Sequence, residues 1–258
     1  MFGYDSFDYN ARIRLGAVPR FTSIDPHAEK YYSISPYAYC ANNPIMRIDP
    51  TGKYWVGTDG KMVTYRQDKS GKIVLSSNAS ADLQKYVGLL NESGSISGKA
   101  AFKEIHKNQT KVYFVYNTED YSVHEFGGTL TGLHQPHTKE GIPARYDVEN
   151  QKFIDEVAFT NNGEYKGATI TIFEKTILEG DGGMQYAYDK KYLDTQYKDL
   201  SFEIKVIATA SHEMKHDTDP QAIQRTKDVQ NGVQNNYNYE PAAYQVTKEV
   251  IEEYINSK

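Results

Sequence analysis

The sequence predicts an α+β domain over residues 54–258, preceded by a short irregular segment over residues 1–53. Three observations lead to this fold class. Residues 110–117 alternate between apolar and polar side chains, which is typical of a β-strand. The apolar run 204–210 continues into a helical pattern, and a second amphipathic segment follows Pro241, a residue that suits the first turn of a helix. The 22 tyrosines in the 258 residues also favour β-structure.

Turn-forming residues divide the larger domain into short elements. Asp59-Gly60 and Ser70-Gly71 each suit a tight turn between two strands. Residues 127–150 are predicted to form a long loop because glycine, proline and polar residues dominate them. The other expected elements are helices over 80–90, 99–106 and 204–216, strands over 110–117, 121–126, 153–159 and 167–178, and a loop over 231–238.

Composition excludes several classes of partner. The net charge is −5, the sequence pI is about 5.8, and lysine and arginine form no block. We therefore expect no nucleic-acid partner and no attraction to anionic membranes. No apolar run reaches the roughly 18 residues of a membrane span, and the first residues do not resemble a signal peptide. A single cysteine, Cys40, excludes an internal disulfide.

The motif His212-Glu213-Met214-Lys215-His216 follows the apolar run and matches HExxH. On a helix, residues four apart share one face, about 5–6 Å from each other, so His212 and His216 can share one Zn²⁺. Glu213 projects beside that pair, within reach of a zinc-activated water whose proton it could accept. The motif predicts metallopeptidase chemistry, whereas a solvated histidine pair on a helix is the plainer interpretation.

Catalytic zinc is usually held by three protein ligands, so a further residue is needed. Glu240, next to Pro241, is the preferred third ligand; a first-turn glutamate that only stabilises the helix dipole is the alternative. Asp217 and Asp219 are the fallback ligands. Together with HExxH, Glu240 resembles the gluzincin-type peptidases, in which a glutamate on a later helix completes the zinc site.

This resemblance implies a zincin-like fold with a mixed sheet, an active-site helix and a C-terminal helix. It also implies that strand 168–173 is the sheet edge that pairs with an extended peptide substrate. Tyr244 is a candidate for oxyanion support. Two alternatives exist for three histidines of the central region, His124, His134 and His137: solvated loop positions, which is the favoured interpretation, and transition-state donors.

Residues 1–53 carry a second resemblance. Tyr9-Asn10-Ala11-Arg12, Arg20-Phe21-Thr22-Ser23-Ile24-Asp25-Pro26, Ser35-Pro36-Tyr37-Ala38-Tyr39 and Asp49-Pro50-Thr51-Gly52 occur in the order found in the core of Rhs (YD-repeat) proteins, in the version common in Bacteroidetes. In that family the core precedes a variable C-terminal toxin domain that acts in interbacterial competition, and an immunity protein protects the producer. The resemblance therefore implies an Rhs-core remnant over 1–53 and a toxin domain over 54–258.

The two resemblances together predict a zinc metallopeptidase toxin that hydrolyses a peptide or protein substrate. It would be made in the cytoplasm, exported without a cleaved signal peptide and delivered to a target cell, with a cognate immunity protein as a partner. The alternative is a non-catalytic, metal-stabilised binding module or an orphan toxin cassette. A nuclease is disfavoured by the acidic charge balance.

Overall fold

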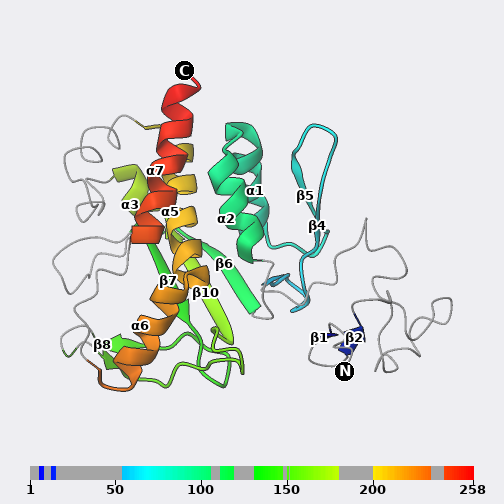
Figure 1. The fold of residues 1–258 in the computed structure, drawn as a ribbon. Coiled ribbons are helices and arrows are strands. Elements are labelled where there is room, and N and C mark those ends of the chain that lie inside the picture. The colour runs from blue at the N-terminus through cyan, green and yellow to red at the C-terminus, as the bar shows by residue number, and fades with distance from the viewer. Residues whose placement is uncertain are drawn as a thin grey trace. The chain divides into compact units, whose positions relative to one another are not determined.

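The computed structural model describes residues 6–8, 13–15, 54–105, 111–118, 131–147, 150, 152–179, 200–233 and 241–258. The chain divides into two compact units, Met1–Thr51 and Gly52–Lys258. In the first unit, β1 (Ser6–Asp8) pairs antiparallel with β2 (Ile13–Leu15). In the second, helices and small mixed sheets confirm the predicted α+β class (Figure 1).

The main sheet of the second unit has four strands among the described residues, in the order β3-β6-β10-β7. These are β3 (Tyr54–Trp55), β6 (Lys111–Asn117), β10 (Gly167–Phe173) and β7 (Gly132–Pro136). The first three run parallel, and β7 runs antiparallel to β10 with Ile170 opposite His134. Two hairpins complete the β-structure: β4 (Tyr65–Gln67) with β5 (Ile73–Leu75), and β8 (Tyr146–Asp147) with β9 (Lys152–Phe153).

Six helices lie within the described part of the chain. They are α1 (Ala81–Ser93), α2 (Ile96–Glu104), α3 (Glu174–Glu179), α5 (Phe202–Thr218), α6 (Pro220–Gln230) and α7 (Pro241–Asn256). Side-chain caps define three of the starts. The Ser80 hydroxyl accepts from the Leu83 amide at α1, and the Ser95 hydroxyl accepts from the Gly98 amide at α2. The Asp219 carboxylate accepts from the Gln221 amide at α6.

The core lies between the sheet and its helices. β6 alternates, with Val112 and Phe114 buried and the residues between them exposed, as expected for a strand covered on one face. Helix α5 packs against β7 and β10, while α2 and α7 pack against α5 (Figure 1). α5 is consequently enclosed on several sides, and ten of its seventeen residues are buried, which agrees with the prediction of a buried helix before the HExxH motif.

Three predictions about elements are wrong. Residues 127–150 are not one long loop, because they contain β7 and the short β8. The strand predicted over 167–178 ends at Phe173, where α3 begins. Of the strand predicted over 153–159, only Phe153 belongs to a strand, and Phe159 forms an isolated bridge with Tyr165. The strand predicted over 121–126 lies outside the described residues.

The edge assignment is also corrected. Strand 168–173 belongs to β10, which has β6 on one side and β7 on the other, so it is internal and cannot pair with a peptide. Among the described strands β7 is the edge beside α5.

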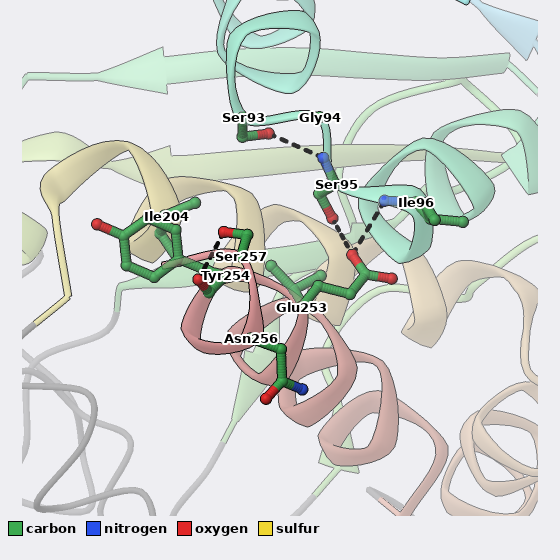
Figure 2. Close-up of a pocket in the computed structure, with 10 residues that line it drawn as sticks. Ser93, Gly94, Ser95, Ile96, Ile204, Glu253, Tyr254, Asn256 and Ser257 are labelled. Carbon is green, nitrogen blue, oxygen red and sulfur yellow. Dashed lines mark hydrogen bonds between the residues drawn. The ribbon is translucent and has the colours of Figure 1, made fainter.

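A cavity of about 270 Å³ lies where the C-terminal end of α7 meets the start of α2 (Figure 2). Glu253 reaches across it, and its carboxylate accepts hydrogen bonds from the Ser95 hydroxyl at 2.8 Å and the Ile96 amide at 2.9 Å. The cavity is thus a packing junction that joins α7 to α2, away from the HExxH side chains. Among the described helices, none combines the length and the apolar character needed to cross a membrane.

Candidate metal centre

His212 and His216 lie on the same face of α5. Their ring centroids are 4.8 Å apart and the ring planes are inclined by 76°. Two imidazoles bound to one tetrahedral zinc ion, with Zn–N bonds of about 2.0–2.1 Å, place their centroids about 5 Å apart. The separation of this pair therefore fits a shared ion.

The hydrogen bond of His212 fixes which of its nitrogens carries the lone pair. Thr247, which is fully buried on α7, donates its hydroxyl proton to the Ala243 carbonyl at 2.9 Å. Its oxygen, 3.2 Å from His212 Nδ1, is then the acceptor of an Nδ1–H bond. The neutral ring keeps its lone pair on Nε2. A partner on the non-ligating nitrogen that sets the tautomer in this way is typical of metal-binding histidines.

His216 is held in the neutral form that binds metals. Burial lowers its pKa well below the ordinary value of 6.5, and positive charge on His212, His134 or Arg225 would lower it further. A neutral imidazole is the protonation state required of a zinc ligand, so no proton has to be displaced near neutral pH.

The Glu213 side chain is buried beneath β7. A Cβ atom added at Gly132 would lie 2.8 Å from Glu213 Cγ and 2.9 Å from its Oε1. Glycine at position 132 is therefore what lets the strand pass over the carboxylate. Glu213 follows His212 directly in α5, and its carboxylate lies close to the backbone of the edge strand.

Asp217 is fully buried one turn beyond Glu213, and its Oδ1 lies 3.1 Å from His134 Nε2. His134 belongs to β7, with its side chain only 6% exposed, so the solvated-loop alternative is wrong for this residue. His137 is also buried and contacts Thr169 and Tyr113. His124 lies outside the described residues.

The third zinc ligand is not identified within the described residues, where no group of three His, Cys, Asp or Glu side chains is close enough to hold a metal ion. Glu240 itself lies outside them, immediately before α7. Of the fallback ligands, Asp217 bonds His134 and Asp219 caps α6. The fallbacks therefore have structural roles, and Glu240 stays the predicted ligand.

Helix α7 also places Tyr244, the residue predicted to support the oxyanion, next to His212. The ring of Tyr244 lies edge-on to His212, with centroids 5.2 Å apart. Tyr244 and Thr247 thus both lie on the face of α7 that contacts His212. Sequence reasoning had not selected Thr247, Gly132 or the His134–Asp217 pair, because each acts through a residue distant in the chain.

Comparisons of the chain with models of protein families, with characterised proteins and with solved structures found no match.

Proposed function

We propose that the protein is a zinc-dependent metallopeptidase in which His212, His216 and Glu240 bind the metal and Glu213 is the general base. The observation that carries this proposal is the geometry on α5, where two histidines at the separation of co-ligands lie next to a buried carboxylate.

Each residue has a defined part in this reaction. Zinc held by His212, His216 and Glu240 would supply a Lewis acid, which would make a water molecule nucleophilic near neutral pH. Glu213 accepts the proton of the attacking water and then donates it to the leaving amine. Thr247 orients His212 through Nδ1, and Tyr244, beside that ring, is the residue assigned to support the oxyanion.

Edge strand β7 gives the substrate a place to bind. It pairs with β10 on one side and with no other strand among the described residues. An extended peptide can add to such an edge through backbone hydrogen bonds. Because Glu213 lies directly under Gly132 of this strand, a peptide paired there would run close to the general base.

The biological setting follows from the Rhs resemblance of residues 1–53. We infer that residues 54–258 act as a toxin domain that hydrolyses a peptide or protein of a competing cell, and that an immunity protein blocks it in the producer. The residues of the resemblance lie outside the described residues, although the described strands β1 and β2 flank Tyr9-Asn10-Ala11-Arg12. The support for this setting is the order of the sequence motifs.

Controlled expression in a susceptible bacterium tests the activity. The wild type and Glu213→Gln are expressed at equal levels, and new protein N-termini in each culture are compared by mass spectrometry. We expect growth arrest and a set of new N-termini with the wild type only. Zinc binding by both proteins without any difference in new N-termini would instead favour the metal-stabilised binding module.

A further inference from the structure

Helix α5 presents a stripe of three buried polar residues to the edge strand: Thr209, Glu213 and Asp217, each four residues after the last. Thr209 Cγ2 and Glu213 Cγ would lie 2.7 and 2.8 Å from a Cβ atom at Gly132, and Asp217 bonds His134. Four helix residues rise about 6.0 Å and two strand residues about 6.8 Å, so these spacings match. β7 therefore follows the stripe in register.

His134 is the side chain that closes this interface. Its Nε2 bonds the Asp217 carboxylate, and its ring centroid lies 5.3 Å from that of Tyr165 and 6.4 Å from that of His216. Tyr165 is itself fixed, because its hydroxyl lies 2.7 Å from the Thr226 hydroxyl of α6. The imidazole is thus held between α5, a tyrosine anchored to α6, and the ring of a proposed zinc ligand.

The distances argue that His134 supports the zinc site without binding the metal. Co-ligand imidazoles have centroids about 5 Å apart, and only a nearly linear arrangement stretches this beyond about 6 Å. The 4.8 Å between His212 and His216 meets this condition, whereas the 6.4 Å between His134 and His216 does not. The Nε2 of His134 is also engaged by Asp217.

We infer that His134 and Asp217 form a positioning pair. Their hydrogen bond holds β7 against the metal-binding helix, which fixes the orientation of His216 and the separation between the substrate-binding edge and Glu213. This inference rests on the proposed zinc site and adds two residues to it. Neither residue is proposed to touch the metal or the substrate.

Zinc affinity and hydrogen exchange test the pair in the full chain. His134→Phe keeps a ring but loses the bond to Asp217, while His134→Gln places an amide N–H near the position of Nε2. We expect His134→Phe to weaken zinc binding about 10–100-fold at unchanged stoichiometry, and to accelerate amide exchange over residues 132–135. His134→Gln should restore both properties towards wild type.

Two results would overturn the inference. Unchanged zinc affinity and unchanged exchange over β7 in His134→Phe would show that the bond positions nothing. Loss of zinc as complete as in His212→Ala, with no rescue by glutamine, would make His134 a ligand. If His134→Phe does not fold, Asp217→Asn replaces it in the test, because asparagine is isosteric and keeps an acceptor without the charge. Asp217→Asn must then weaken zinc binding several-fold, or the inference fails.

The proposed function can fail separately. A wild-type protein that binds no zinc would remove the zinc site, whereas the exchange rates of β7 in the His134 variants would still report whether the pair holds the strand.

Discussion

Thr247 Oγ1 of α7 lies 3.2 Å from Nδ1 of His212 on α5, so the C-terminal helix sets the tautomer of a residue in the HExxH motif. The same hydroxyl donates to the Ala243 carbonyl, which leaves its oxygen as the acceptor of the imidazole proton. The two helices pack directly on each other. The geometry of the proposed metal site therefore depends on how α7 is held.

Replacing Thr247 tests this dependence. Thr247→Val keeps the shape of the buried side chain but removes the acceptor for His212, so we expect zinc affinity to fall about 10–100-fold. Thr247→Ser, which keeps the hydroxyl, should bind zinc like the wild type. Competition with a chromophoric chelator measures both constants. Equal affinities for the two variants would show that the hydroxyl does not orient His212.

Gly132 is predicted to be intolerant of any side chain. The Cβ of Gly132→Ala would lie 2.7 Å from Thr209 Cγ2 and 2.8 Å from Glu213 Cγ, so the strand or the helix has to move. We expect a loss of about 1–3 kcal/mol in the free energy of unfolding. Chemical denaturation measures this change.

Two controls sharpen the glycine test. Gly88→Ala, in α1, places a Cβ with no heavy atom within 4 Å, and it should stabilise the protein slightly, by up to about 1 kcal/mol. Thr209→Ala removes one of the two clashing carbons, so it should recover part of the loss when combined with Gly132→Ala. Additive effects of the two substitutions would contradict direct contact between strand and helix.

Glu253 is predicted to anchor the C-terminal half of α7. Its carboxylate accepts from the hydroxyl and the amide of Ser97, at 2.8 and 3.0 Å. It also accepts from the Ser95 hydroxyl and the Ile96 amide, which Figure 2 shows. These donors are at the start of α2, where a negative charge is also favoured by the helix dipole. Glu253→Gln should lower the free energy of unfolding by about 1–3 kcal/mol.

Glu252→Gln is the matched control on the same helix. Glu252 faces Lys248 at 3.7 Å in an exposed ion pair, which contributes less than about 1 kcal/mol. Thermal or chemical unfolding of the two variants should therefore differ clearly. An equal effect at both positions would mean that the bonds of Glu253 to α2 do not hold α7.

Acid should destabilise the fold through His137. Burial, the largest cause, and charge on His134 together lower the pKa of this residue from 6.5 to about 4, against an opposing effect of Asp217. Between pH 6.5 and 4 the unfolded chain binds a proton that the folded chain does not. The free energy of unfolding therefore contains the full contribution of neutral His137 above pH 6.5. It decreases by about 2–3 kcal/mol as the pH falls towards 4.

His137→Gln removes this titration while keeping a polar group near Thr169. Urea unfolding at pH 7, 5.5 and 4, with a chelator present so that metal release does not contribute, should show a shallower pH dependence for the variant. The same slope in variant and wild type would contradict the assignment to His137.

Local sequence pattern was sufficient for the parts of the site that a single helix carries. HExxH spacing on an apolar run predicted α5 and the shared face of its histidines, and Pro241 predicted the start of α7. The sequence did not predict edge strand β7, because Gly132-Leu133-His134-Gln135-Pro136 contains one large apolar residue and ends in proline. Such a segment has no strand signal of its own and owes its conformation to pairing with β10.

Features that depend on contacts between distant parts of the chain could not be predicted from the sequence either. Thr176 and Ile177 favour a strand by their β-branched side chains, yet they lie in α3, where Ile177 is buried in the core. Asp217 and His134 are 83 positions apart, and no periodicity links them. From the sequence, Asp217 could therefore be interpreted only as a neighbour of the HExxH motif. Its hydrogen bond to His134 of β7 forms because the strand packs on the helix.

The most direct test of the zinc site is the metal content of the purified protein, measured by mass spectrometry for the wild type, His212→Ala, Glu240→Ala and Glu213→Gln. The proposal predicts about one zinc per chain in the wild type and in Glu213→Gln, with zinc lost or greatly weakened in the other two. A wild type that holds no zinc even after reconstitution would contradict the metallopeptidase function.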